Sequence, residues 1–177
     1  TPQMRSGSGI LIEPFSLWGN GEREYYIPEA LKQDGKGSLV VTAKRMSVPA
    51  NGAVSAANPY LCYYGTACEW TSGKIHTLGK VSFMYGRMEA RIKMPKGIGM
   101  WPAFWMLGTD IKTNPWPACG EIDIIEAKGA SPKMAFGTVH GPGYSGGEGI
   151  GGLTPLKTLN YSTYNVYAIE WKPDQIR

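Results

Sequence analysis

The chain has 177 residues, 42% of them hydrophobic, which is enough for the core of one domain. Only 18% are charged, and the net charge of +4 is spread along the chain without a basic run, which argues against a nucleic-acid partner. No stretch of 18 apolar residues exists, so no transmembrane helix and no membrane partner are expected. The 24 glycines and 13 prolines favour turns and strands over long helices.

The first third of the chain is predicted to be poor in regular structure. Residues 1–20 are Gly- and Ser-rich, and the polar, aromatic segment 18–26 is predicted to be a loop that enters a surface strand. Residues 38–43 form a β-branched run after a Gly-Lys-Gly turn and are predicted to be a strand. Residues 47–68 carry Pro, Asn and Gly and are predicted to be a long loop.

The three cysteines give an indication of the cellular compartment in which the protein acts. Cys62 and Cys68 lie six residues apart, so a disulfide could close this tight loop, although the spacing leaves the pairing open. A disulfide would suit a secreted, extracellular protein, which is the expected location. Cys119 is interpreted as a small buried hydrophobe and not as a nucleophile.

Residues 81–94 show the clearest alternation in the chain. One face carries apolar or small residues, namely Met84, Gly86, Met88, Ala90, Ile92 and Met94, and the other face carries aromatic and charged ones. This pattern predicts a half-buried antiparallel strand. A second strand is predicted within residues 100–107, and because Pro102 cannot donate a ladder hydrogen bond, the strand should begin there or lie at an edge. A Pro-rich loop, residues 108–119, follows and holds Trp116.

The segment Glu-Ile-Asp-Ile-Ile-Glu, residues 121–126, is predicted to be a strand. Regular alternation places Glu121 and Asp123 on one face but turns Glu126 into the isoleucine face, where an unpaired carboxylate would cost several kcal/mol. A β-bulge at Ile124-Ile125 would return Glu126 to the face of the other acids. The alternative is a solvated polar face, which would usually show mixed charges and not interleaved isoleucines.

Two more strands are predicted towards the C-terminus. Residues 134–140 form one, with Phe136, Thr138 and His140 on one face, and residues 165–171 form the other, before a turn at 173–175. Residues 141–155 are predicted to be a Gly-rich loop. Short strands separated by turns indicate a β-sandwich or barrel. The chain is expected to be a single catalytic domain over residues 1–177 that is truncated at the C-terminus, because the last hairpin would leave an open edge; truncation at the N-terminus is left open.

Paired carboxylates at a fixed separation are what cleavage of a glycosidic bond requires. One attacks or stabilises the anomeric carbon, and the other protonates the leaving oxygen. Acids on one strand face lie roughly 5–7 Å apart, whereas retention requires about 5–5.5 Å and inversion about 6.5–9.5 Å, so the spacing favours retention without deciding it. Trp101, Trp105 and Trp116 flank the acids and could be platforms for sugar rings, whereas Trp171 is assigned to the core.

Four segments carry a resemblance to a known family. The acidic segment resembles the bulged signature of glycoside hydrolase family sixteen, in its laminarinase (endo-β-1,3-glucanase) branch. Residues 85–91 and 99–108 resemble the blocks before the catalytic strand, residues 138–142 resemble the block after it, and residues 18–26 resemble the early Trp-Gly-Asn segment.

The resemblance implies an all-β fold, a β-jelly-roll sandwich of two antiparallel sheets with a concave cleft, and hydrolysis of β-1,3-glucan, with cleavage of mixed-linkage glucan left open. It assigns Glu121 as nucleophile, Glu126 as general acid/base, and Asp123 as the residue that tunes the nucleophile. The residues implied to contact or surround the glucan are Asn20, Arg87, Trp101, Trp105, Trp116 and His140. For His140 a structural role is the alternative, and for Arg87 a surface ion pair with Glu89 or Glu24.

Other interpretations stay open. The chain could be a non-catalytic β-glucan-binding module of the same fold, or a galactan-cleaving relative such as an agarase or carrageenase. The family's opening Trp-x-Asp-Glu-Phe-like strand is missing, as are the strands expected after the last hairpin, so a second chain that completes the fold is an alternative. No cofactor is expected to be needed for catalysis. A structural calcium occurs in some members, but no oxygen-rich loop identifies its ligands here.

Overall fold

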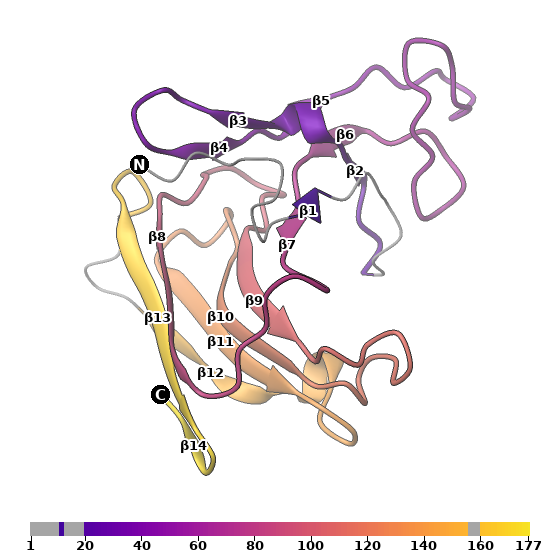
Figure 1. Ribbon diagram of the computed structural model, residues 1–177. Coiled ribbons are helices and arrows are strands. Elements are labelled where there is room, and N and C mark those ends of the chain that lie inside the picture. The colour runs from indigo at the N-terminus through magenta and orange to yellow at the C-terminus, as the bar shows by residue number, and fades with distance from the viewer. Residues whose placement is uncertain (1–10, 13–19, 156–159) are drawn as a thin grey trace. The chain divides into compact units, whose positions relative to one another are not determined.

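The computed structural model describes residues 11–12, 20–155 and 160–177. Residues 18 and 19 of the early Trp-Gly-Asn segment lie outside these ranges. The chain divides into two compact units, Thr1–Ser82 and Phe83–Arg177 (Figure 1). In the described ranges all regular elements are strands apart from two short 3-10 helices, which confirms the all-β class. No helix in those ranges is long and apolar enough to cross a membrane.

The first unit contains short strands in three small sheets. Its elements are β1 (Leu11–Ile12), β2 (Glu24–Tyr26), η1 (Pro28–Ala30), β3 (Leu31–Gln33), β4 (Leu39–Val41), β5 (Lys44–Arg45), β6 (Trp70–Ser72) and β7 (Ile75–His76). The sheets have the orders β2-β6-β5, β3-β4 and β1-β7. The predicted strand within 38–43 is confirmed as β4, and the predicted surface strand as β2. Strands β1, β3, β5, β6 and β7 were not predicted, because two or three residues are too few to show an alternation.

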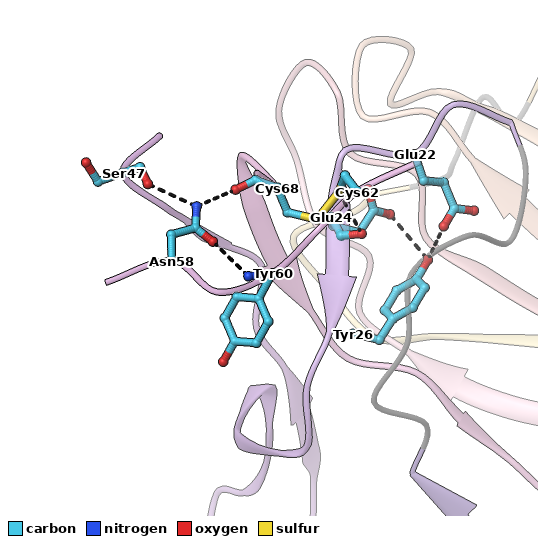
Figure 2. The surroundings of a disulfide bond; sticks show 8 residues. All are labelled: Glu22, Glu24, Tyr26, Ser47, Asn58, Tyr60, Cys62 and Cys68. Atoms are coloured by element: carbon cyan, nitrogen blue, oxygen red, sulfur yellow. Dashed lines mark hydrogen bonds between the residues drawn. A yellow bond between two sulfur atoms is a disulfide. The ribbon is translucent and has the colours of Figure 1, made fainter. Parts of the chain in front are cut away.

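The predicted long loop 47–68 contains no named strand, and Cys62 and Cys68 form a disulfide within it (Figure 2). The completely buried side chain of Asn58 stabilises this loop. The Asn58 side-chain amide donates to the carbonyl oxygens of Ser47 and Cys68 at 2.9 and 2.8 Å. The disulfide that the spacing left open is therefore present, and a buried hydrogen-bond network supports it.

The second unit is built from longer strands in two antiparallel sheets. Its elements are β8 (Gly86–Ile92), β9 (Ala103–Leu107), β10 (Glu121–Ala127), β11 (Met134–His140), η2 (Gly146–Glu148), β12 (Ile150–Pro155), β13 (Asn165–Lys172) and β14 (Gln175–Ile176). One sheet has the order β12-β11-β10-β9 and the other β14-β13-β8. The predicted strands in this half of the chain are confirmed, as is the turn at 173–175, which joins β13 and β14.

The two sheets of this unit pack against each other through a shared core. Buried residues come from both sheets, namely Met88, Ile124, Ile125, Ala127, Ala135, Tyr167 and Ile169, and Trp171 packs against them as predicted. Each of these strands turns one face inward, so its alternate residues face away from the core. The unit is thus a sandwich of two antiparallel sheets, and the acidic strand β10 supplies part of its core.

Three details differ from the predicted boundaries or refine them. The strand predicted over 81–94 begins only at Gly86, because Tyr85 and Gly86 have φ values of 66° and 104°, which break the extended backbone. As a consequence Met84 is 75% exposed and does not join the apolar face. The strand predicted within 100–107 begins at Ala103, directly after Pro102, and lies at the edge of its sheet, as expected.

The prediction that residues 141–155 form only a loop was wrong for 150–155, which form strand β12 along β11. Gly151 and Gly152 concealed this strand, since glycine is a poor strand former. The register explains their presence, because a side chain at Gly151 would place its Cβ 2.2 Å from the carbonyl oxygen of Gly137. Glycine here allows the close approach of two backbones.

Candidate active site

A β-bulge places the three acids of β10 on one face of the sheet. On β11, Asp123 pairs with Thr138 and Glu126 pairs with Phe136, so two residues of β10 stand opposite one residue of β11. The register on β9 shifts at the same point. Without the bulge Glu126 would face the core. With it, Glu121, Asp123 and Glu126 share the outer face, as the sequence predicted.

The opposite face of β10 anchors this arrangement. Ile124 and Ile125, the two bulged residues, are 8% and 3% exposed and lie in the core of the sandwich. Sliding the strand by one residue would exchange these side chains with the acids, which would expose two isoleucines and bury charge. The hydrophobic core therefore fixes the position of the acids.

Two tryptophans donate hydrogen bonds to the two glutamates. The indole Nε1 of Trp116 lies 2.6 Å from Oε2 of Glu121, and that of Trp101 lies 2.8 Å from Oε1 of Glu126. Both indoles are nearly half exposed, at 44% and 47%. Each donor comes from a loop segment next to β9 or β10, so each glutamate is oriented from outside the strand that carries it. An N–H donor to a carboxylate is among the stronger hydrogen bonds in proteins.

Asp123 is the buried acid of the three, at 5% exposure, and it is bound by His140. The Nε2 atom of His140 lies 3.1 Å from Oδ2 of Asp123. A neutral His140 with its proton on Nε2 would present an N–H to Asp123 and leave Nδ1 as a lone pair. That buried Nδ1 has no hydrogen-bond partner in the part of the chain that the structure describes, in keeping with this tautomer.

The electrostatics separate Asp123 from its neighbours. Burial, together with the charges of Glu121 and Glu126, raises the pKa of Asp123 to about 8. Asp123 therefore holds a proton at neutral pH. A neutral carboxyl between two glutamates reduces the repulsion in the cluster and can donate a hydrogen bond to Glu121, which contributes to the same shift.

The structure brings four of the six predicted sugar-contacting or neighbouring residues to the acid face. Trp101, Trp116 and His140 bind the acids directly, as described above. Trp105 of β9 pairs with Asp123 across the ladder, and opposite residues in a ladder share a face. Their roles as sugar contacts remain predictions, but their positions agree with them.

Arg87 and Asn20 belong to other elements of the chain. Arg87 lies on β8 in the other sheet, where it forms ion pairs with Glu89 at 2.9 Å and Glu170 at 3.2 Å. One of these is the surface pair given as the alternative to sugar binding. Asn20 lies in the first unit and begins a left-handed turn with Gly21, at φ values of 57° and 66°. Contact of either residue with glucan stays a prediction.

Sequence reasoning missed two features of the site. The tryptophans were expected to be flat platforms, and their role as hydrogen-bond donors to the glutamates was not foreseen. Gly149 was assigned to a loop, yet a Cβ there would lie 2.5 Å from Cε1 of His140, so only glycine lets the backbone pack on this ring. No sequence signal separates Gly149 from its glycine-rich neighbours.

The described residues contain no cluster of side chains of the kind that usually binds a metal ion. No group of three or more His, Cys, Asp and Glu side chains in residues 11–12, 20–155 and 160–177 could hold a metal ion. Glu121 and Glu126 instead accept hydrogen bonds from neutral indoles, an arrangement that suits acid–base chemistry by carboxyl groups. The structural calcium that occurs in some members of the resembled family is therefore assigned no ligands here.

The family model of glycosyl hydrolases family 16 matches residues 29–177, which include strands β3 to β7 of the first unit and every strand of the second unit. The chain belongs to glycosyl hydrolase family 16. The matched region contains the acid cluster, so this membership covers the part of the chain where the chemistry would occur.

Three relatives show how far the similarity extends. A β-glucanase of Rhodothermus marinus is 38% identical over 167 residues, which cover 90% of this chain and 52% of that protein. The laminarinase catalytic domain of Thermotoga maritima MSB8 is 41% identical with a TM-score of 0.76, covering 90% of this chain and 59% of that one. The catalytic domain of an endo-1,3-beta-glucanase (laminarinase) from Thermotoga petrophila RKU-1 is 39% identical with a TM-score of 0.80, covering 94% and 65%. This family 16 chain thus spans about half to two thirds of the length of these relatives.

Proposed function

We propose that this chain carries the catalytic centre of a retaining endo-glycosidase that hydrolyses β-1,3-glucan. The observation that supports it most is the bulged strand β10, which holds Glu121 and Glu126 on one face with a neutral Asp123 between them. The laminarinases and β-glucanases among its relatives support the choice of substrate.

The indole hydrogen bonds suggest which oxygen of each glutamate takes part in the reaction. Glu121 accepts a hydrogen bond from Trp116 on Oε2, which leaves Oε1 as the oxygen without an indole donor. Glu121 would attack the anomeric carbon through Oε1 and form the glycosyl-enzyme intermediate. Glu126 accepts a hydrogen bond from Trp101 on Oε1. As general acid, Glu126 would therefore donate a proton to the leaving oxygen from Oε2.

Asp123 and His140 would serve the nucleophile indirectly. Asp123 carries a proton at neutral pH and can donate it as a hydrogen bond to Glu121, while His140 fixes the orientation of Asp123. After the intermediate forms, Glu126 has lost its proton and can act as base for the water that hydrolyses it. No step requires a metal or a cofactor.

The Glu121→Gln variant tests this proposal in a form that separates catalysis from folding. Hydrolysis of laminarin, followed by release of reducing ends, should fall by about 10³-fold or more, because the variant cannot form the covalent intermediate. The Glu121→Ala variant should regain activity with added azide and yield a glycosyl azide of inverted configuration. Unchanged hydrolysis by Glu121→Gln would rule out the assigned nucleophile.

Two other functions remain to be separated by substrate. A glucan-binding module without catalysis would bind laminarin and release no reducing ends, but it would have no need for two glutamates held by indole donors. A galactan-cleaving enzyme would act on agarose in preference to laminarin. Comparing release from laminarin, lichenan and agarose under the same conditions distinguishes these possibilities and shows whether mixed-linkage glucan is cut.

The proposed site of action is outside the cell. The Cys62–Cys68 disulfide supports it, since disulfides persist in oxidising compartments. An insoluble or cell-wall glucan would also be accessible only to a secreted enzyme. Detection of the protein in the culture medium, with the disulfide intact by mass spectrometry, would bear this out, whereas retention in a reducing compartment would contradict it.

A further inference from the structure

The first unit presents a tyrosine side chain that the proposed chemistry does not use. Tyr64 is 69% exposed and lies at the tip of the loop closed by the Cys62–Cys68 disulfide. Exposed tyrosines are common on flexible loops, where they carry no particular meaning. Tyr64 is different because the loop around it is held rigidly.

Several contacts fix this loop. The Cys62 amide donates to the carbonyl oxygen of Thr66 at 2.8 Å, and the Gly65 amide donates to that of Cys62 at 3.0 Å. Below this turn, the buried Asn58 binds the carbonyl oxygen of Cys68 (Figure 2). A short turn with cross-strand hydrogen bonds, a disulfide and a buried amide has little freedom to collapse when it meets a ligand.

The ring of Tyr64 is also held at its edges. A Cβ on Gly21 would lie 2.4 Å from the Tyr64 hydroxyl oxygen, so the polar end of the ring rests on bare glycine backbone. Tyr63 packs edge-to-face against the ring, with centroids 5.2 Å apart and planes at 89°. The ring is therefore oriented in advance while most of its surface stays exposed.

A cavity of about 100 Å³ adjoins this ring. It is lined by Glu22, Arg23, Cys62, Tyr64, Thr66, Ala67 and Glu69. Arg23 and Glu69 form an exposed ion pair at 2.9 Å, which keeps planar donors and acceptors at the surface. Two carboxylates against one guanidinium make the lining slightly acidic, which disfavours an anionic ligand.

A flat exposed ring beside planar polar groups matches a ligand with an apolar face and hydroxyl groups at its edge. A pyranose has this form, since its C–H face packs on aromatic rings and its hydroxyls bind carboxylates and guanidinium groups. We propose that Tyr64 and the adjoining cavity form a binding subsite for a neutral glucose unit of a β-glucan chain. The choice of glucan rests on the proposed function, whereas the class of ligand, a neutral sugar, rests on the geometry.

The experiment uses the full chain with Glu121→Gln as the parent, so that the sugar is bound and not hydrolysed. Laminarihexaose is titrated while the backbone amides of Gly65, Thr66 and Glu69 are followed by NMR. We expect saturable shifts of these amides. Affinity read from them should fall about tenfold in Tyr64→Ala, because this variant removes the flat ring on which the sugar would pack. Tyr64→Phe, which keeps the ring, should bind nearly as well as the parent.

Controls separate a lost contact from a damaged fold. Tyr64→Leu keeps apolar bulk but removes the flat face, so it should bind as weakly as Tyr64→Ala while the amide spectrum remains that of a folded protein. Tyr164→Ala removes another exposed tyrosine, in the second unit, and should leave the titration unchanged. Absence of shifts in the parent, or equal affinity in Tyr64→Ala, would overturn the proposal.

The outcomes also distinguish this proposal from the proposed function. If the native chain releases reducing ends from laminarin but the three amides do not shift, the subsite is refuted and the glucanase stands. If the amides shift and the native chain releases nothing, the subsite stands and the catalytic proposal fails. A Tyr64-dependent dimer in sedimentation velocity, without sugar binding, would show that the ring serves self-association and would also refute the subsite.

Discussion

Carboxylates crowd together in both units, but each unit accommodates them differently. In the first unit Glu22 and Glu24 share a donor within the cluster, since the Tyr26 hydroxyl lies 2.9 Å from one and 3.3 Å from the other (Figure 2). In the second unit Glu121 and Glu126 receive separate indole donors from loops, and the third acid, Asp123, holds a proton. The acids of the first cluster bind a donor that belongs to the cluster itself, whereas the glutamates of the second cluster bind donors from outside it and stay accessible.

A raised pKa does not by itself distinguish the two clusters. Burial is the largest cause of the raised pKa of both Glu22 and Asp123, and in both a neighbouring carboxylate adds to it. What differs is the direction of the donors. A phenol between two acids occupies the space where a substrate would have to sit, while indoles at the outer edge leave it open. The geometry of the donors, therefore, marks the second cluster as the one suited to catalysis.

The largest effect that would test this contrast comes from neutralising one acid in each cluster. Glu126→Gln should lower kcat/KM on laminarin by about 10²–10⁴-fold, because it removes the proton donor to the leaving oxygen. Glu24→Gln, the matched change in the first unit, should leave kcat/KM within about twofold. Comparable losses in both variants would mean that the two clusters do not differ as proposed.

The next effect concerns pH and the proton on Asp123. Unfolded, this group titrates near 3.8, and folded at about 8, so between these values the folded state holds a proton that the unfolded state has lost. The free energy of unfolding should therefore fall as pH rises from about 4 to about 8, by at most about 1.4 kcal/mol per pH unit from this group.

The Asp123→Asn variant isolates that contribution, since Asn cannot ionise and still accepts a hydrogen bond from His140. Urea unfolding at pH 5 and pH 8 should show a smaller loss of stability in the variant than in the native chain. Glu22, whose raised pKa acts in the same direction, is present in both proteins and cancels in the comparison. Equal losses would show that Asp123 is already ionised at neutral pH.

A smaller effect is expected from one indole donor. Trp116→Phe keeps an aromatic ring but removes the hydrogen bond to Glu121, which as a bond to a charged group is worth about 1.5–3 kcal/mol. The rate kcat/KM should fall by about 10–100-fold, measured as reducing ends from laminarin. Trp70→Phe in the first unit is the matched control, because Trp70 is also exposed but donates to neither glutamate. A fall in kcat/KM of less than twofold in Trp116→Phe would show that the Trp116 indole does not orient Glu121.

Part of the fold and of the site could be predicted from the sequence alone. The bulge in β10 followed from one conflict, since Glu126 could not stay on the isoleucine face, and the structure confirms it. The sandwich followed from alternation in long strands such as β8 and β13. Both are local consequences of which side chains must be buried.

Features that depend on distant contacts could not be foreseen. Strand β12 exists because Gly151 allows close contact with Gly137 of another strand, and nothing in the run of glycines indicates that partner. The indole donors to the glutamates are likewise set by loop conformations. The Tyr26 donor was missed for a related reason, because alternation along Glu22, Glu24 and Tyr26 places them on one face without showing that a hydroxyl bridges the acids.

The smallest effect, on stability alone, tests the first cluster. Tyr26→Phe removes the phenol proton and leaves Glu22 and Glu24 facing each other, at a cost of about 1–2 kcal/mol in the free energy of unfolding. Tyr25→Phe should change it by less than about 0.5 kcal/mol, because the Tyr25 ring would still stack on Tyr60 at 4.9 Å. Lowering the pH should restore part of the stability of Tyr26→Phe, since the raised pKa of Glu22 lets that acid take up a proton in place of the lost donor. If instead Tyr26→Phe lowered laminarin hydrolysis while stability stayed unchanged, the first cluster would have a part in catalysis and the contrast between the two units would fail.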